Sequence, residues 1–266
     1  MQLLESIRIR RRKIVKNLGR KLVRWLDRFL GQQSLIGDHP VFDPADFDFV
    51  TTLENNWQPI RQELDAVLAV RSAIPGFHEL SPDQQRISYG DHWKMFVLFG
   101  FGQWAERNAS RCPNTVEVLK QIPGLRNAFF SILAPRFHIV PHRGVTKAVI
   151  RCQLALKVPA DREQLFIRVD KEIMHWTEGK CMVFDDTYDH EVQNNTDETR
   201  AVLFLDIDRP MAWRGRLFSR LLLTAIQWTA YVKDARSNLQ DWEARFEHAI
   251  ERAEKSQISD TDEESH

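Results

Sequence analysis

The stretch AFFSILAPRFHIV, residues 128–140, marks the point at which the hydrophobic pattern of the chain changes to a period of two. Short strand-like segments follow one another from here to residue 207, and turn signals such as Glu178-Gly179-Lys180 separate them. Several short strands at this spacing are typical of an antiparallel sandwich or barrel. The sequence therefore predicts a mainly β fold with flanking helices, with strands at 128–133, 137–140, 148–158, 164–169, 172–176, 180–184, 189–193 and 200–207.

The segments upstream of this β region have helical patterns. Apolar residues recur at helical spacing between Leu53 and Val70, and a short helix is predicted over 113–121, with Pro113 just inside its start. We interpret the aromatic-rich block His92–Glu106 as core packing, with the lining of a substrate channel as the alternative. The expected organisation is a basic amphipathic helix over 1–30, a domain over 42–208 that divides into a helical layer at 42–124 and a β core at 125–208, and C-terminal helices with an acidic tail over 209–266.

The overall charge and the cysteine content exclude several classes of protein. The chain holds 37 Lys and Arg and 37 Asp and Glu, so its formal net charge is zero. This balance argues against a globally basic nucleic-acid-binding protein, and no nucleic-acid partner is expected. Three cysteines, at positions 112, 152 and 181, are too few for a disulfide framework or a cysteine-based zinc site. The cytoplasm, as a reducing compartment, fits this cysteine usage.

Charge is nevertheless segregated along the chain, in two segments that are also apolar. Residues 1–30 carry ten basic and two acidic side chains, a net charge of +8, on a predicted amphipathic helix. Residues 209–233 carry five basic and no acidic side chains around a strongly apolar run. Both segments suit an anionic membrane surface, and neither is apolar for long enough to cross a bilayer. We therefore predict peripheral attachment to the inner face of the membrane, and packing on the domain itself stays open as the alternative.

Two histidines in the β region are candidate metal ligands: His142 at the exit of one strand and His190 at the entry of another. Imidazole nitrogens suit Fe(II), and Arg200 is a residue type that holds a distal carboxylate. His138 and His175 are also available, so the pattern alone does not choose the ligands. From the residues alone, an iron enzyme, a zinc hydrolase and a cupin-like binding module all stay open.

The region between Cys112 and Pro210 resembles the aspartyl/asparaginyl β-hydroxylase family, and upstream similarity extends the likeness to roughly residues 42–210. The resemblance rests on motifs that are spread over the whole β region. They are Cys112-Pro113-Asn114-Thr115, Ser131-Ile132-Leu133, Pro141-His142-Arg143-Gly144, Arg151 with Leu154-Ala155-Leu156 and Pro159, Trp176-x-x-Gly179-Lys180, Phe184-Asp185-Asp186, His190-Glu191-Val192 and Thr199-Arg200.

This resemblance implies a double-stranded β-helix core of the jelly-roll or cupin-like kind, and a dioxygenase that uses Fe(II), O₂ and 2-oxoglutarate. His142 and His190 match the two histidines that bind iron in the family. Arg200, Ser131 and Arg151 match residues that bind 2-oxoglutarate, and Arg200 is the one that holds its far carboxylate.

Three further positions carry information through the resemblance. Asp186 matches an outer-shell acid that orients an iron-bound water. Gly144 stands where most 2-oxoglutarate oxygenases have the carboxylate of their metal triad, and the animal members of the family similarly have glycine there. A turn glycine that needs a positive φ is the other interpretation of Gly144. Gln153 stands where the animal enzymes have a histidine.

The substrate is indicated less directly. The basic, apolar ends favour hydroxylation of a lipid A-type acyl chain or of another membrane-proximal substrate, whereas Gly144 is closer to the peptide-type enzymes. A peptidyl Asp/Asn β-hydroxylase and a non-catalytic scaffold on the membrane surface are therefore the alternatives.

Overall fold

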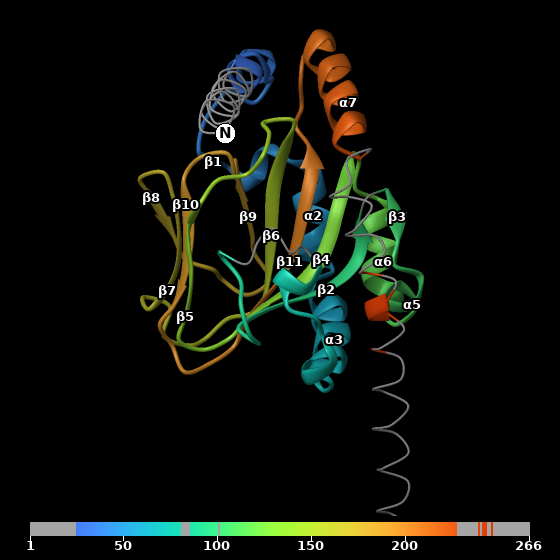
Figure 1. Cartoon of the computed structure of the whole chain (residues 1–266), viewed down its shortest axis with the longest axis vertical. Helices are drawn as coiled ribbons and strands as arrows, with labels where there is room; N and C mark the ends of the chain where they lie inside the picture. The colour runs from blue at the N-terminus through green and yellow to red at the C-terminus, as the bar shows by residue number, and fades with distance from the viewer. Residues whose placement is uncertain are drawn as a thin grey trace, which may run out of the picture.

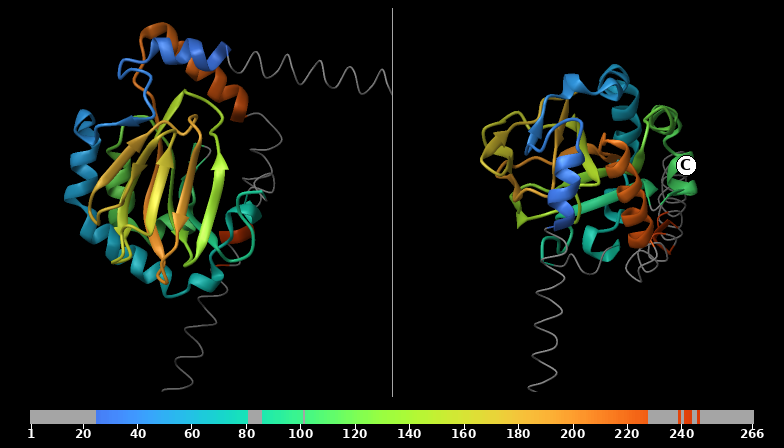
Figure 2. Two further views of the ribbon diagram at one scale, coloured as in Figure 1. Left: turned by 90° about the vertical axis from the view of Figure 1, so that its left-hand side faces the viewer. Right: turned by 90° about the horizontal axis from the view of Figure 1, so that it is seen from above.

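The computed structural model describes residues 25–80, 86–100, 102–227, 239, 241–243 and 246 of the chain. Two β-sheets face each other, and helices cover the outer face of the larger sheet (Figures 1 and 2). The strands are β1 (Val41–Phe42), β2 (Trp93–Gly100), β3 (Gln103–Trp104), β4 (Leu125–Leu133), β5 (Phe137–His142), β6 (Val149–Lys157), β7 (Leu165–Val169), β8 (Glu172–Met174), β9 (Cys181–Phe184), β10 (His190–Asn194) and β11 (Arg200–Asp208). The α-helices are α2 (Asp48–Asn55), α3 (Trp57–Leu68), α4 (Phe77–Leu80), α5 (Glu106–Ser110), α6 (Pro113–Lys120) and α7 (Trp213–Gln227), and short 3-10 helices lie at Pro44–Asp46 and Arg71–Ala73.

The strand order identifies the fold. The larger sheet has the order β1-β9-β6-β11-β4-β2-β3, and the smaller sheet has the order β5-β10-β7-β8. All paired strands within them are antiparallel. Strands β4 to β11 therefore form the eight-stranded, two-sheet arrangement of a double-stranded β-helix. The predicted fold class is confirmed, and each predicted strand overlaps one of these eight.

Apolar side chains fill both faces of the larger sheet, which explains why β11 reads as a near-continuous hydrophobic run. Successive side chains along a strand point to opposite faces. Val202 and Phe204 join the cluster between the two sheets, whereas Leu203 and Leu205 join the cluster on the outer face beneath the helices. Arg200 belongs to the same inward-pointing set of β11, so one end of the barrel interior contains a charged side chain.

The helical layer expected over 42–124 is wrong between residues 93 and 104, because residues 93–100 form β2 and residues 103–104 form β3. β2 pairs with β4, and β3 pairs with β2, in the larger sheet. Side chains of β2 are buried on both faces: Phe96 packs on the helix side and Met95 packs between the sheets. A strand that is buried on both faces shows no alternation of apolar and polar residues. A search for a period of two therefore does not find it.

The helix expected between Leu53 and Val70 is two helices, α2 and α3, because Asn56 leaves the helical conformation with φ −111° and ψ 13°. The short helix predicted over 113–121 is α6. A side chain of α3 fixes it, since the carboxylate of Glu63 accepts the backbone N–H of Asn114 at 2.7 Å and that of Thr115 at 2.9 Å. The helical layer is thus tied together by a side-chain cap.

Residues 25–33 are helical and pack against α7, the helix that follows β11. The ring centroids of Phe29 and Phe218 lie 5.4 Å apart, and Leu30 is fully buried in the cluster that joins the two helices. Both helices stand over one end of the barrel (Figure 1). Packing on the chain itself therefore accounts for one face of each helix. The remainder of the predicted helix, residues 1–24, and the segment 228–233 and the acidic tail lie outside the described residues.

Among the helices of the described part, none is long and apolar enough to cross a membrane.

Candidate active site

His142 and His190 lie directly opposite each other, as the last residue of β5 and the first residue of β10. Their ring centroids are 4.1 Å apart. The ring of His190 also lies 5.9 Å from that of Phe184, whose strand partner is Arg151 of the larger sheet. The fold therefore brings the two predicted ligands together between the sheets, at the end of the barrel where β9 ends and β6 begins.

The hydrogen bonds of the two rings fix which nitrogen is free. Nδ1 of His142 lies 2.9 Å from the carbonyl oxygen of Val140, and Nδ1 of His190 lies 3.0 Å from that of Tyr188. Because a carbonyl oxygen only accepts, each Nδ1 donates, and each neutral ring keeps its lone pair on Nε2. Hydrogen bonds of this kind orient metal-binding histidines in proteins.

Both imidazoles are held in the neutral form. Burial lowers the pKa of His142 and, together with the charges of His142 and Arg151, lowers the pKa of His190 to about 3. Neutral imidazole is the form that binds a metal ion. The pair is thus suited to metal binding in its tautomer and in its charge state.

Asp186 fills the space into which a side chain at position 144 would point. A Cβ placed on Gly144 would overlap the carboxylate of Asp186, and the backbone N–H of Gly144 donates to the Asp186 carbonyl at 2.6 Å. Gly144 is not one of the glycines with positive φ, so the interpretation as a turn glycine is wrong. Glycine is needed here because Asp186 approaches so closely.

Arg151 pairs with two carboxylates at this end of the barrel. Its guanidinium lies 2.8 Å from Asp186 and 3.1 Å from Asp206. Burial raises the pKa of Asp186 to about 6, against the opposing effect of Arg151. The charge of Arg151 is therefore matched within the chain, and its predicted contact with 2-oxoglutarate stays a prediction.

Arg200 is the opposite case, a buried cation without a carboxylate partner. Its side chain is 1% exposed, and it makes no ion pair with any of the described residues. Within the described part of the chain, its guanidinium makes two long hydrogen bonds of 3.4 Å, from one terminal nitrogen to the carbonyl and hydroxyl oxygens of Ser131, and its Nε makes none. Burial alone lowers its pKa to about 9. An uncompensated buried charge of this kind is unfavourable unless a ligand matches it.

Two tryptophans that the sequence did not single out as site residues build the surroundings of Arg200. Trp176 lies beneath its guanidinium, 4.8 Å from the ring centroid, and donates its indole N–H to Gln153 at 3.0 Å. Trp93 donates its indole N–H to the hydroxyl of Ser131 at 3.0 Å. Trp176 occurs in one of the family motifs, which was the one available signal. Gln153 therefore has a defined contact: it holds the ring on which Arg200 rests.

The other two candidate histidines are separated from this site. His138 points away from the barrel interior and lies 2.7 Å from a carboxylate oxygen of Glu191. Nδ1 of His175 donates to the carbonyl oxygens of Arg162 and Leu165 in the smaller sheet. The geometry thus selects His142 and His190 as the pair that could share one ligand.

The donor set fits a metal ion that needs only two protein ligands. Among the described residues there is no group of three or more His, Cys, Asp or Glu side chains that could hold a metal. The two Nε2 lone pairs can bind such an ion and leave its other positions to small molecules. The unmatched guanidinium of Arg200 fits a dianion that reaches into the barrel.

Comparison with known proteins agrees with these features. The family model for aspartyl/asparaginyl β-hydroxylase matches residues 54–210. A curated relative from Rhizobium tropici, an ornithine lipid ester-linked acyl 2-hydroxylase, is 39% identical over 225 residues, which is 85% of this chain and 80% of the relative. The human aspartyl/asparaginyl β-hydroxylase is 32% identical over 168 residues, but the match spans 61% of this chain and only 21% of the human protein.

Among solved structures, a cupin domain of an XRE family transcriptional regulator from Enterobacter cloacae is similar to 44% of this chain and 96% of its own, with a TM-score of 0.30 and 16% identity. The family model covers more than half of the chain, and it includes both histidines, Asp186 and Arg200. The chain therefore belongs to the aspartyl/asparaginyl β-hydroxylase family of hydroxylases.

Proposed function

We propose that this protein is an Fe(II)- and 2-oxoglutarate-dependent dioxygenase that hydroxylates the acyl chain of a membrane lipid. The observation that carries the cosubstrate assignment is the unmatched charge of Arg200. A buried guanidinium with a free Nε and no carboxylate partner suits the distal carboxylate of 2-oxoglutarate, which would add the missing countercharge and hydrogen bonds. The hydroxyl of Ser131, held by Trp93, is placed to assist.

The two histidines would hold the iron through Nε2, because each Nδ1 is occupied by a backbone carbonyl. Iron with 2-oxoglutarate and O₂ supplies the oxidising power that hydroxylation of an unactivated carbon requires. The chain contributes orientation and exclusion of water, since the space between the sheets is lined by buried apolar side chains. Asp186 is held by Arg151 where it could accept a hydrogen bond from a water molecule beside the histidines.

A lipid substrate is supported first by the extent of the similarity. The alignment with the Rhizobium acyl 2-hydroxylase is longer than the family match over 54–210, so the likeness to the lipid enzyme continues into the flanking segments. The human peptide-type relative aligns over a shorter stretch. The ester-linked acyl chain of an ornithine lipid is therefore the first substrate to test, ahead of lipid A-type acyl chains.

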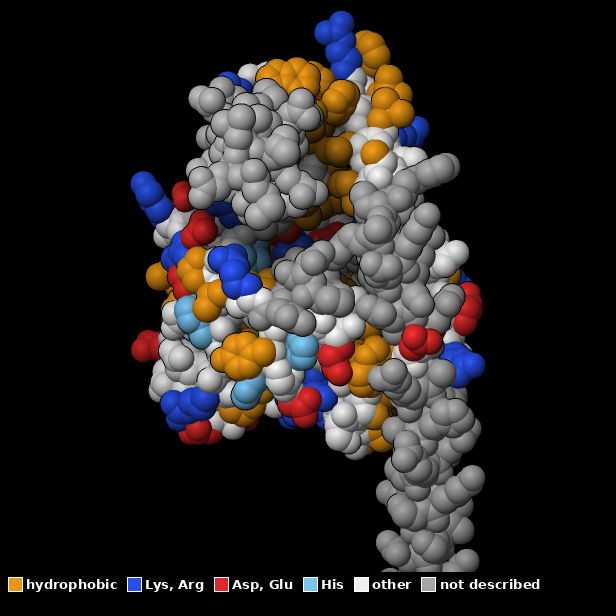
Figure 3. Space-filling model, viewed as in Figure 1, with side chains coloured by type: hydrophobic (Ala, Val, Ile, Leu, Met, Phe, Trp, Pro, Cys, Tyr) orange, Lys and Arg blue, Asp and Glu red, His pale blue; other side chains and the backbone are white. Residues whose placement is uncertain are grey.

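A lipid substrate is supported secondly by the outer face of α7. Trp213, Leu217 and Leu221 are 64%, 55% and 62% exposed and lie along one side of this helix. Arg214 and Arg220 flank this stripe on its two sides, as in helices that lie in a membrane interface. Figure 3 shows hydrophobic side chains along α7 with basic side chains beside them. Because α7 stands over the end of the barrel that contains the histidines, attachment here would bring that end toward a membrane (Figure 1).

On this proposal the protein works at the cytoplasmic face of a membrane, as a peripheral protein. The net charge of +8 within residues 1–30 would add attraction to anionic lipids. This attraction weakens as salt is raised.

The cosubstrate assignment is tested by anaerobic titration of the purified protein with Fe(II) and 2-oxoglutarate, monitored by visible charge-transfer absorption. We expect saturable binding in the wild type and a loss of about 100-fold in 2-oxoglutarate affinity in Arg200→Met. Arg136→Gln, which removes a guanidinium from a surface pair, is the matched control and should bind normally. Iron binding without any effect of 2-oxoglutarate would contradict the assignment.

The substrate assignment is tested by incubating the enzyme, supplied with Fe(II), 2-oxoglutarate and O₂, with ornithine lipid, lipid A or an Asp-containing peptide. The masses of the products are then measured by mass spectrometry. We expect addition of one oxygen atom to the ester-linked acyl chain of the ornithine lipid, and no addition with His142→Ala. Hydroxylation of the peptide alone would favour the peptidyl enzyme. A wild-type protein that binds neither iron nor 2-oxoglutarate would favour the scaffold.

A further inference from the structure

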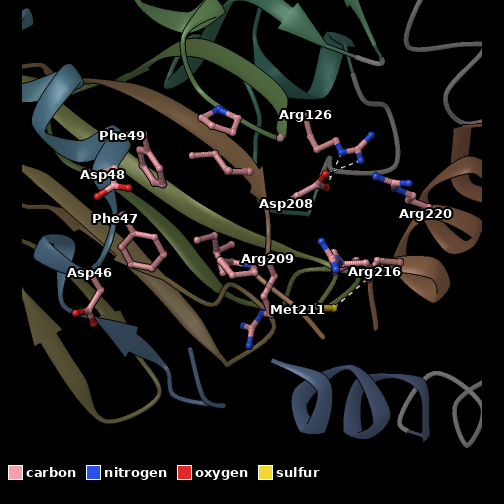
Figure 4. Close-up of a pocket in the computed structure, with 17 residues that line it drawn as sticks. Asp46, Phe47, Asp48, Phe49, Arg126, Asp208, Arg209, Met211, Arg216 and Arg220 are labelled. Atoms are coloured by element: carbon pink, nitrogen blue, oxygen red, sulfur yellow. Dashed lines mark hydrogen bonds and ion pairs between the residues drawn. The ribbon is translucent and has the colours of Figure 1, made fainter. Parts of the chain in front are cut away.

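A groove of about 400 Å³ lies on the outer face of the larger sheet, beside the start of α7 (Figure 4). Its floor is apolar, with Ile150 and Ile207 from the sheet and Phe47 and Phe49 from the segment before and within α2. Seven of the seventeen lining residues are charged, so the groove combines an apolar floor with charged sides.

The charges of the groove differ in whether they are already matched. Arg126 makes two hydrogen bonds of 2.6 and 2.7 Å to Asp208, so this pair is internally neutral. Arg216 and Arg220, one turn apart on α7, line the same end of the groove and make no ion pair with the described residues. They therefore offer two unmatched guanidinium groups to an anion.

Apart from Asp208, which Arg126 neutralises, the acidic residues of the lining lie elsewhere. Asp46 and Asp48 lie at the end of the groove away from the arginines of α7 (Figure 4). The groove is thus polarised, with its positive end beside α7. An anionic group is favoured there and disfavoured at the far end.

The groove is separate from the candidate active site. Ile150 points to the outer face of β6, whereas its neighbour Arg151 points between the sheets toward Asp186. The sheet therefore stands between the groove and the histidines. A ligand in the groove would not compete with a ligand of the histidine pair.

We propose that this groove binds the headgroup of an anionic phospholipid, with Arg216 and Arg220 on the phosphate, the acyl chains on the exposed stripe of α7, and the headgroup alcohol beyond the phosphate in the groove over Ile150. The stripe on α7 gives the reason for a lipid rather than a free anion. Leu217 and Leu221 follow these two arginines in the sequence and are exposed on the adjacent side of the helix. A lipid whose chains lie along that stripe has its headgroup at the level of the groove.

The test is calorimetric titration of the full chain with dihexanoyl phosphatidylglycerol below its micelle concentration, so that no membrane is present. We expect saturable binding in the wild type and a loss of affinity of at least about tenfold in Arg216→Gln/Arg220→Gln. Arg214→Gln is the matched control, since this exposed arginine lies on the other side of the stripe and does not line the groove. It should keep wild-type affinity.

Each other outcome overturns the proposal in a recognisable way. Equal losses in Arg214→Gln and in the double variant would mean general electrostatic attraction without a site. Equal affinity for inorganic phosphate would mean an anion site that does not recognise lipid, and equal affinity for dihexanoyl phosphatidylcholine would mean an apolar site that ignores charge. Absence of saturable binding would remove the site altogether. None of these results depends on hydroxylation, so the proposed function is tested separately.

Discussion

Two buried arginines at opposite ends of β11 have contrasting surroundings. Arg200, the first residue of the strand, is 1% exposed; among the described residues its guanidinium contacts the Trp176 ring and makes two long hydrogen bonds to Ser131, with no carboxylate partner. Arg209, one residue after the strand, is 3% exposed and pairs with the fully buried Asp185. It also donates to the carbonyl oxygen of Gly37 at 3.2 Å. One charge is matched by the chain, and the other is not.

On the proposed function, the difference separates a charge that links parts of the chain from a charge that binds the cosubstrate. The network around Arg209 joins the connector after helix 25–33 to the loop that carries Asp186, and Lys147 reinforces it with bonds to Asp185 at 2.8 Å and to Asp38 at 2.6 Å. Such a network fixes loops but needs no ligand. A charge that is buried without a partner instead lowers stability and is retained where a ligand uses it.

The largest expected effect on stability comes from replacing Arg209, the arginine whose charge is matched by Asp185. Arg209→Met should lower the free energy of unfolding by about 3 kcal/mol, because it leaves the buried Asp185 with too little countercharge. Urea denaturation followed by circular dichroism measures this change. Arg136→Gln, in an exposed ion pair, is the control and should leave the midpoint where it is. If Arg209→Met were as stable as the wild type, the pairing of Arg209 with Asp185 would not stabilise the fold, and the contrast with Arg200 would be wrong.

Replacing Arg200 should have the opposite effect on the free energy of unfolding. In protein free of iron and 2-oxoglutarate, Arg200→Met should leave the free energy of unfolding unchanged or raise it by about 1 kcal/mol, because it removes a desolvated charge and keeps most of the volume. The same denaturation experiment measures it. Addition of 2-oxoglutarate with iron should stabilise the wild type and not this variant. Destabilisation as large as that of Arg209→Met would show that Arg200 is structural after all.

The smallest effect is a pH dependence of the metal-free protein. The pKa of His190 is about 3 in the fold and 6.5 in a model peptide, so between these values the unfolded chain binds a proton that the native state does not. Stability is therefore lost as the pH falls below about 6.5, by about 1 kcal/mol from His190 between pH 7 and pH 5.5. The raised pKa of Asp186 acts in the opposite direction from about pH 6 downward, so the net loss over this interval is smaller than the contribution of His190 alone.

Unfolding in urea at both pH values, with a chelator present, measures this dependence. The variant His190→Gln should show a shallower loss, because it removes the group that titrates only in the unfolded state. An identical pH dependence in the variant and the wild type would mean that other groups cause it.

The strands show how far local pattern goes. The eight strands of the β-helix core could be predicted because a series of short segments separated by turn residues is a local signal, even where a strand such as β11 is apolar on both faces. β2 could not, because it is an apolar run outside that series, and periodicity alone does not distinguish such a run from a buried helix segment. The break between α2 and α3 at Asn56, in contrast, has a local cause, because Pro59 lies in the first turn of α3 and could not continue a helix from α2.

In the candidate site, too, some residues could be predicted from the sequence and some contacts could not. The resemblance pointed to His142, His190, Asp186 and Arg200, and the fold brings the first three to one end of the barrel. Sequence did not indicate the contact of Gln153 with Trp176, nor the close approach of Asp186 to Gly144, because both join residues on different strands or loops. The groove beside α7 combines residues from four separate segments and could not be predicted from the sequence either.

The sequence by itself therefore determined the eight strands of the β-helix core, the family and the identity of the candidate ligands, since these follow from local pattern and from motifs. The tertiary structure alone decided which charges are matched. Whether Arg200 or Arg209 meets a carboxylate depends on residues brought together from distant parts of the chain, and a buried charge has its energy set by those neighbours. The three-dimensional packing thus pairs Arg209 with Asp185 and leaves Arg200 without a carboxylate among the described residues.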